Sequence, residues 1–405
     1  TPRQALDPSM SEPVRILHTS DWHLGRSLHG FGLQEAQEVA VRWIVQRAIE
    51  LQVDALAIAG DVFDRAIPPI ESLRLFNEAL ASLAEHGIVT VATAGNHDSG
   101  DRLATYGTLL RPGTHLVGSI GAVGQPVHVK PRSAGAPLLL YPLPYLEPDV
   151  ARLELAEHPE ALLERSHHAV LSAALDRISL DLAARGRPRS VVIGHGFVTS
   201  DGSTGVETCD SERDLTVGGV QAVSASIFAN RGLDYVALGH LHRPHTVSQS
   251  PTVRYSGSLL RYSLSESAHS KSITVVEIGE PGATPTFWEE EIPQPRGMQR
   301  LRGSMDWLVG GDCAAARADF VELVVTDDTY PDRMYARLDA LFPFALTKEH
   351  RPERVAYPVI QQRGDARGRE PMDVLQDFYR KVTQMDPTED EVELLRKAFE
   401  MSRDT

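Results

Sequence analysis

The stretch YVALGHLH, residues 235–242, begins as an apolar strand and ends in two histidines separated by one residue. Side chains at positions i and i+2 of an extended chain leave the same face, so His240 and His242 point together just beyond a buried strand. Taken alone, a histidine pair beside a strand is more often hydrogen-bonded structure than a metal site. The remaining sequence must therefore decide what these two side chains do.

Other apolar runs of the same kind recur along residues 15–279, and helical patterns separate many of them. Residues 33–52, 70–86 and 161–184 have helical periodicity. This alternation predicts an α/β layered fold in which helices cover a sheet. The run at 272–278 follows other short runs without an intervening helix, which predicts that part of the sheet is mixed or antiparallel. The strands are predicted at 15–20, 55–60, 88–95, 138–143, 190–195 and 235–240.

The amino-acid composition excludes several kinds of binding site and function. The 405 residues are 42% hydrophobic and carry a net charge of −15, which opposes non-specific binding to a polyanion through many cationic contacts. Cys209 and Cys313 are the two cysteines, too few for a thiolate metal cluster. We find no apolar run of the ~18 residues that a membrane span needs, and expect no membrane association and a cytoplasmic protein.

The chain divides into five predicted segments. Residues 1–9 resemble an addition left by cloning, and residues 10–280 form the main α/β domain. Prolines cluster at 280–295, which places a boundary before a small α+β domain at 281–355. A polar linker at 356–371 leads to two amphipathic helices at 372–405, where Thr388 and Glu391 have capping-box spacing.

Polar residues of the types that bind metals follow five of the predicted strands. In an open α/β sheet, ligands gather outside the carboxyl ends of the strands, so these distant segments can converge. Carboxylates, an amide and imidazoles without thiolates favour a hard-to-borderline divalent ion such as Mn²⁺, with Mg²⁺, Fe²⁺ or Zn²⁺ as alternatives. Two ions ~3.5–4 Å apart would share one carboxylate. The residues of these types at the strand ends are Asp21, His23, Asp61, Asp64, Asn96, His97, Asp98, His195, His240 and His242.

The ordered motifs D-x-H, G-D-x-x-D, G-N-H-D, G-H and G-H-x-H resemble the signature of the metallophosphoesterases. The segments TSDWHLGR (19–26), GDVFDRAIPP (60–69) and YSGSLLRYSLSE (255–266) are further similar to the SbcD family, the nuclease subunits of bacterial SbcCD complexes. The resemblance implies a layered metallophosphoesterase fold with a small α+β capping domain and C-terminal helices. It also implies Asp21, His23, Asp61 and His242 around one metal, and Asp61, Asn96, His195 and His240 around the other.

Neighbouring residues receive supporting roles. His97 follows a ligand and suits donation to the phosphoryl group or leaving oxygen, and Asp98 is expected to orient the ring of His97. Asp64 is expected to support the site by hydrogen bonding. Four arginines near the motifs could meet phosphates or remain solvated surface, namely Arg26, Arg65, Arg243 and Arg261.

The resemblance implies a Mn²⁺-dependent DNA exonuclease and endonuclease that acts on ends, hairpins and breaks in DNA repair, recombination and replication. It implies an SbcC-like coiled-coil ATPase as partner, a homodimer within a heterotetramer, and association with the nucleoid when bound to DNA. The C-terminal helices are expected to dock the ATPase, or alternatively to pack on their own core. The dimer interface is expected within residues 70–110, from Leu73, Phe76, Leu80, Leu103 and Leu109.

Three alternatives stay open. The same metal site would serve a small-substrate phosphodiesterase or a protein phosphatase, and the fold would also serve a non-catalytic scaffold. Individually, Asp21, Asp61 and Asn96 could instead close turns or cap helices. The remaining histidines with no motif context are expected to be solvated or hydrogen-bonded structure, among them His18, His29, His86, His128, His167, His168 and His245.

Overall fold

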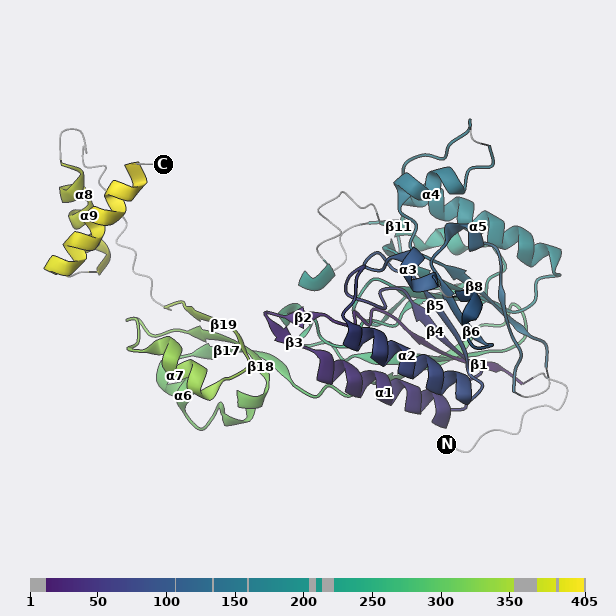
Figure 1. Cartoon of the computed structure of the whole chain (residues 1–405), viewed down its shortest axis with the longest axis horizontal. Helices are drawn as coiled ribbons and strands as arrows, with labels where there is room; N and C mark the ends of the chain where they lie inside the picture. The colour runs from purple at the N-terminus through teal and green to yellow at the C-terminus, as the bar shows by residue number, and fades with distance from the viewer. Residues whose placement is uncertain are drawn as a thin grey trace.

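The computed structural model describes residues 12–105, 107–132, 135–158, 160–203, 209–212, 222–352, 370–383 and 386–403. The expected cloning addition at 1–9 and most of the expected linker at 356–371 lie outside these residues. Figure 1 shows an α/β body, a smaller domain beside it and a C-terminal pair of helices.

Two six-stranded sheets form the body. The first has the order β16-β15-β1-β4-β5-β6, in which β1, β4, β5 and β6 run parallel, β15 pairs antiparallel with β1, and β16 pairs antiparallel with β15 at the edge. The second has the order β13-β14-β12-β9-β8-β7 and is likewise mixed. The predicted mixed α/β architecture is therefore confirmed. The strand bounds are β1 Val14–Thr19, β4 Ala55–Ala59, β5 Val89–Thr93, β6 Thr114–Val117, β7 Val127–Val129, β8 Leu138–Leu143, β9 Ser190–His195, β12 Tyr235–Gly239, β13 His245–Gln249, β14 Thr252–Tyr255, β15 Ser272–Ile278 and β16 Thr286–Glu291.

The sheets pack face to face because their central strands are apolar on both sides. In β4, Leu56 and Ile58 lie in the core beneath the helices, whereas Ala55, Ala57 and Ala59 lie in the layer between the sheets. Alternate side chains of a strand point to opposite faces, and the small alanines leave room for the second sheet. Val191 and Ile193 of β9 fill this layer from the other side.

Helices cover both outer faces. The first sheet is covered by α1 (Gln34–Glu50) and α2 (Ile70–Glu85), and the second by α4 (Pro148–Glu154) and α5 (His167–Ala184) (Figure 1). The helix predicted from residue 161 begins later because the Ser166 hydroxyl accepts a hydrogen bond from the Ala169 N–H at 3.2 Å. A short helix, α3, spans Gly100–Ala104. Within the described residues, no helix combines the length and the apolar composition needed to span a membrane.

The smaller domain is a three-stranded parallel sheet of β17 (Met298–Gly303), β18 (Phe320–Val325) and β19 (Ala345–His350). Two helices, α6 (Met305–Val309) and α7 (Met334–Leu341), cover it and share its apolar core. The predicted boundary at residue 280 is misplaced, because β16 pairs with β15 in the first large sheet and carries the body to Glu291. Prolines at 281 and 285 mark the turn of this hairpin rather than the domain boundary.

An aromatic contact joins the small domain to the body. The hairpin of β2 (Ser27–Leu28) and β3 (Phe31–Gly32) follows directly on the segment that carries Asp21 and His23. The ring of Phe31 lies 5.9 Å from the ring of Phe320 and 5.9 Å from that of Phe344, measured between centroids. The small domain therefore packs on a hairpin that continues from the candidate metal ligands.

The C-terminal helices are α8 (Pro371–Thr383) and α9 (Glu389–Arg403), which pack against each other. The capping box is confirmed: the Thr388 N–H donates to Glu391 Oε2 at 2.8 Å, and the Glu391 N–H donates to Thr388 Oγ1 at 3.4 Å. Apolar side chains on both helices remain exposed, including Phe378 at 56% and Leu394 at 70%.

The apolar surface expected for a dimer is only partly present. Phe76, Leu80 and Leu103 are buried in the core of the body, so the prediction that they form an interface is wrong. The apolar periodicity of α2 marks the face that packs on its own sheet. Leu73 and Leu109 are exposed, at 42% and 80%.

Candidate metal centre

Five segments converge where the two sheets meet. The segments after β1, β4 and β5 come from the first sheet, and the end of β9 and the segment after β12 come from the second. Strand β4 of the first sheet contacts β9 and β12 of the second across the interface between the sheets. The carboxyl ends of these strands therefore bring residues 21, 61, 96, 195 and 240 to one place, as the sequence predicted.

Sharp turns aim these side chains. Asp21, His23 and Asp61 adopt positive φ values of 50°, 43° and 49°, and His240 has a φ of 115°. Such backbone conformations are uncommon for residues other than glycine, and strained positions of this kind concentrate at functional sites. Four of the seven expected ligands thus lie at turns that the surrounding structure must hold in place.

Two glycines let the segments approach closely. A Cβ at Gly95 would lie 2.1 Å from Asp61 Oδ1, and a Cβ at Gly239 would lie 1.8 Å from the carbonyl oxygen of Ala59. Any larger residue at either position would push a strand end away from the centre. The glycines of the G-N-H-D and G-H-x-H motifs are thereby explained by backbone packing.

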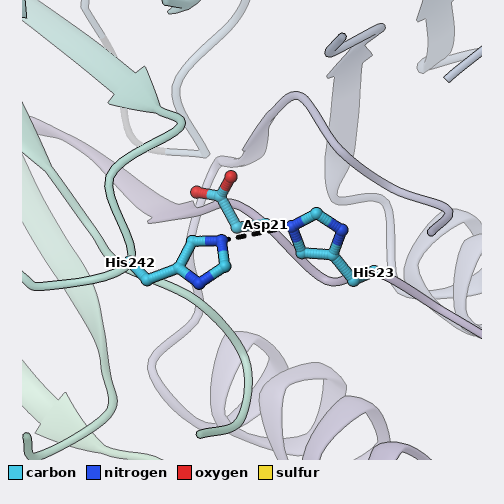
Figure 2. Close-up of side chains that lie close together, drawn as sticks. All are labelled: Asp21, His23 and His242. Atoms are coloured by element: carbon cyan, nitrogen blue, oxygen red, sulfur yellow. Dashed lines mark hydrogen bonds between the residues drawn. The ribbon is translucent and has the colours of Figure 1, made fainter. Parts of the chain in front are cut away.

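Asp21, His23 and His242 form one group of candidate ligands, and all three are buried. Figure 2 shows the two imidazoles facing each other beside the Asp21 carboxylate, with 3.2 Å between the two Nε2 atoms. Two nitrogens bound to one ion at about 2.1 Å lie about 3.0–3.4 Å apart. The separation therefore fits two ligands of one cation.

Asp61 lies between this group and a second one. Its Oδ2 is 3.4 Å from His195 Nε2 and 3.6 Å from His23 Nε2. His195 Nδ1 donates to the Ala59 carbonyl at 2.9 Å, so Nε2 is the nitrogen that would bind an ion once it has lost its proton, and Asn96 Oδ1 lies 3.0 Å from it. The position of Asp61 suits a carboxylate shared by two ions.

His240 has a less direct position. Its backbone N–H donates to both carboxylate oxygens of Asp21 at 3.0 Å, and its ring lies 5.3 Å from the ring of His195. Across the described ranges, the close groups of metal-binding side chains are Asp21–His23–His242, His23–Asp61–His97 and Asp21–Asp61–His195. The structure thus places His240 next to the second group without bringing its imidazole into one of these groups.

The structure corrects the role expected of Asp98. Its carboxylate accepts hydrogen bonds from the backbone N–H groups of Val62, Phe63 and Gly95 at 2.9–3.0 Å, so it ties two ligand-bearing segments together. The ring of His97 is instead held through Nδ1, which lies 3.0 Å from the Asp64 carbonyl oxygen. The prediction that Asp98 orients His97 is wrong because the ring is held by the Asp64 carbonyl, and the hydrogen bonds of the Asp98 carboxylate in the described structure go to backbone amides.

Burial and charge set the protonation of the candidate ligands. Burial would raise the pKa of Asp61, but the neighbouring His195 holds it well below its usual range. Against the effect of burial, Asp61 in turn raises the pKa of His195 to about 9. Burial lowers the pKa of His23 well below its usual value. An ionised carboxylate beside neutral imidazoles is the form that binds a divalent cation, and a bound ion would displace the proton of His195.

Comparisons with known proteins agree with this geometry. Residues 14–244 match the family described as calcineurin-like phosphoesterase. The SbcD protein of the SbcCD nuclease from Bacillus subtilis is 38% identical over 288 residues, which cover 69% of each chain. This chain belongs to the SbcD family of calcineurin-like phosphoesterases. The SbcD proteins of Rhodobacter capsulatus and Escherichia coli match a larger share of the chain. The first is 31% identical over 81% of this chain and 84% of its own, and the second is 29% identical over 86% and 88%.

As an SbcD family member, the chain is a metallophosphoesterase, and its buried Asp and His residues provide a site for divalent metal ions. The donor set fits such ions independently of the family. In the described structure, the close groups join four imidazoles to the two buried carboxylates of Asp21 and Asp61, with no thiolate among them.

The four arginines differ sharply. The Arg26 side chain is 16% exposed, its guanidinium lies over the Tyr262 ring at 5.1 Å, and its Nη1 is 3.5 Å from Asp64 Oδ1. Within the described residues, this buried Nη1 has no hydrogen-bond partner. Arg65 is 64% exposed. Arg261 donates to the carbonyl of His269, and Arg243 is an exposed residue beside His242.

The expected support from Asp64 is only indirect. Its Oδ1 lies 3.6 Å from His23 Nδ1, beyond ordinary hydrogen-bond distance, and its carbonyl oxygen is the partner of His97. Sequence reasoning missed Ser211, Glu266 and Lys271, which surround the Nδ1 side of His242. Glu266 ends the SbcD-like segment 255–266, which was the one available signal.

Proposed function

We propose that this chain is the nuclease subunit of an SbcCD-type complex and hydrolyses phosphodiester bonds of DNA at ends, hairpins and breaks. The observation that carries the proposal is the buried cluster in which Asp61 lies between His23 and His195. Two divalent ions, Mn²⁺ in the first place, would bind there. When bound, such ions neutralise phosphate oxygens and lower the pKa of water, which makes it a nucleophile at neutral pH.

The ligands divide into two sets around Asp61. Asp21, His23 and His242 would bind one ion with Asp61, supported by the 3.2 Å separation of the two Nε2 atoms. Asn96, His195 and His240 would bind the other ion with Asp61. For His240 the support is its place beside His195, and the ring would have to turn toward the ion.

His97 would act on the substrate. Its Nδ1 must donate to the Asp64 carbonyl, since a carbonyl oxygen only accepts, and this leaves Nε2 for the phosphoryl group or the leaving oxygen. A protonated imidazole donates from Nε2 and stabilises negative charge on that oxygen. Arg26 would contact a phosphate through the buried Nη1 that lacks a hydrogen bond in the described structure.

One experiment tests the activity. Purified protein is incubated with linear duplex DNA, hairpin DNA, a small chromogenic diester and a phosphopeptide, each with Mn²⁺ and with chelator. We expect Mn²⁺-dependent cleavage of DNA, and none with chelator. Turnover of the small diester or the phosphopeptide without DNA cleavage would favour the phosphodiesterase or phosphatase alternatives. Absence of all four activities would favour a scaffold.

The α8–α9 pair would dock the coiled-coil ATPase. Val374, Phe378 and Leu394 expose apolar surface on these helices, and every proposed ligand precedes residue 243. Truncation after Gly368 should therefore retain the melting temperature and Mn²⁺-dependent activity while strongly weakening partner binding. A pull-down with the ATPase, run beside a melting curve, checks this. Undiminished binding by the folded truncation would contradict the docking role.

We further propose a homodimer, within a heterotetramer that includes the ATPase. The start of α2 and the segment before it expose the apolar side chains of Ile67, Ile70 and Leu73, which would take part in the interface. Replacing Ile70 and Leu73 by glutamate should convert a dimer to a monomer in analytical ultracentrifugation. A wild-type protein that sediments as a monomer at micromolar concentration would reject this assembly.

A further inference from the structure

The imidazoles of the metal centre are anchored in different ways. His195 is fixed through a backbone carbonyl, that of Ala59. His242 is fixed by side chains: its Nδ1 lies 2.9 Å from Ser211 Oγ and 3.5 Å from Glu266 Oε1. Ser211 is therefore the nearer partner, and Glu266 stands behind it.

The hydrogen-bond directions follow from the groups involved. Ser211 Oγ is 2.6 Å from Glu266 Oε1, and an ionised carboxylate only accepts, so the serine hydroxyl donates its one hydrogen to Glu266. Ser211 Oγ can then only accept from His242, so Nδ1 of that imidazole must carry a hydrogen. In the neutral imidazole, the form that binds a cation, the lone pair of His242 is consequently on Nε2, the nitrogen that faces His23 (Figure 2).

Glu266 occupies an unusual environment for a carboxylate. Its side chain is fully buried, and its second oxygen accepts from Lys271 Nζ at 2.5 Å, another fully buried group. Lys271 Nζ also donates to the carbonyl of His242 at 2.8 Å and to Ser258 Oγ at 2.9 Å. A buried ion pair usually stabilises a fold little more than an apolar pair of equal size, so stability alone does not account for it.

We infer that Glu266 is a positioning residue of the metal centre, acting through Ser211 to hold His242 with its Nε2 lone pair toward the ion. Lys271 balances the charge of Glu266 and fixes the backbone of His242. This inference rests on the proposed metal site. Carboxylates behind a metal-binding histidine fix its tautomer and ring orientation, and losing such a partner typically costs ~10–100-fold in metal affinity.

The chain offers a matched control. Ser263 also donates its hydroxyl to Glu266 Oε1, at 3.0 Å, and the structure gives it no contact with His242 among the described residues. Ser211→Ala and Ser263→Ala therefore each remove one hydroxyl from the same carboxylate oxygen. A purely structural role for Glu266 would make the two variants alike, whereas a positioning role makes them differ at His242.

The experiment measures metal binding and tautomers rather than cleavage. Titration calorimetry with Mn²⁺ should show two ions in the full-length protein, with one ion weakened ~10–100-fold in Ser211→Ala and the other changed less than about threefold. Ser263→Ala should retain both affinities. In ¹⁵N-histidine NMR spectra of metal-free protein, recorded at a pH high enough for His242 to be neutral, this residue should be the Nδ1–H tautomer in wild type and Ser263→Ala, and a mixture in Ser211→Ala.

Equal metal affinities and equal tautomers in the two serine variants would overturn the inference, and so would a wild-type protein that binds no Mn²⁺. If Ser211→Ala fails to fold, the paired change Glu266→Gln with Lys271→Met removes both charges and should weaken the same single ion; unchanged affinity there overturns the inference. A wild-type protein that binds two ions but cleaves no DNA would reject the proposed nuclease and leave this inference intact.

Discussion

The two large sheets contribute different chemistry to one centre. Segments after strands of the first sheet carry both carboxylates, the amide and two of the imidazoles: Asp21, His23, Asp61, Asn96 and His97. The second sheet contributes imidazoles alone, from His195, His240 and His242. The first sheet therefore provides the negative charge that attracts a cation, and the second completes the coordination with neutral donors.

The two contributions also differ in how they are held. Segments of the first sheet bond to one another: Asp21 N–H donates to the Gly60 carbonyl at 3.1 Å, and His23 N–H to the Asp61 carbonyl at 2.9 Å. Two of the three histidines of the second sheet are held by the first, since His195 bonds to Ala59 and His240 to Asp21, whereas His242 is held by Ser211. The comparison indicates that the first sheet forms a self-supporting frame onto which the second sheet docks.

The largest effect is expected from replacing Asp61, the carboxylate of the first sheet that both ions would share. Asp61→Asn removes the charge that both ions would share, and asparagine tolerates the positive φ of this position. We expect both ions to be lost and hydrolysis to fall by more than the ~10²–10³-fold that removal of one electrostatic contact typically costs. His195→Ala, a change in the second sheet, should remove chiefly one ion. Elemental analysis of metal content together with cleavage assays compares the two.

The metal contents of the two variants would show whether the sheets contribute separately to the binding of the ions. An Asp61→Asn protein with two full ions and normal activity would remove Asp61 from its shared position. Loss of both ions in His195→Ala as well would show that the contributions of the sheets are not separable in the way the hydrogen bonds suggest.

Much of the site was predictable because its ligands are close in sequence to strand ends. Parallel strands bring their carboxyl ends to one edge, so the motifs at 21–23, 61–64, 96–98 and 240–242 could be assembled without coordinates. The layered α/β fold followed from the same alternation of apolar runs and helices. The family resemblance then assigned individual ligands, which strand geometry alone would not have divided between two ions.

The other features of the site and the fold depend on contacts between residues that are far apart in the sequence. Nothing near Lys271 indicates that its ammonium group is fully buried against Glu266. Asp98 sits beside His97 in sequence, yet its carboxylate turns to the amides of another segment. The apolar stripe of α2 likewise could not reveal which of its residues face the core, so Phe76 was assigned wrongly to an interface.

A smaller effect should follow from a change to His97, which follows a strand of the first sheet and would act on the substrate. We expect His97→Ala to retain both metal ions and the fold while turnover falls by ~10²-fold, the scale of lost general-acid or electrostatic help. Metal content and single-turnover cleavage measure the two effects separately. Because His97 also lies in a close group with His23 and Asp61, loss of an ion in this variant would make it a ligand instead.

The smallest effect is expected from two arginines that follow strands of the first sheet, Arg26, which is mostly buried, and Arg65, which is mostly exposed. Arg26 lies over the Tyr262 ring and has a buried Nη1 that lacks a hydrogen bond in the described structure, whereas Arg65 is mostly exposed. A hydrogen bond to a charged group contributes about 1.5 kcal/mol or more, so Arg26→Gln should raise the KM for DNA roughly tenfold with little change in kcat. Exposed ion pairs contribute ~0.2–1 kcal/mol, so Arg65→Gln should change KM less than about fivefold. Steady-state cleavage of one duplex substrate measures both variants. Equal KM values would show that burial beside the metal centre does not select Arg26 as the phosphate contact.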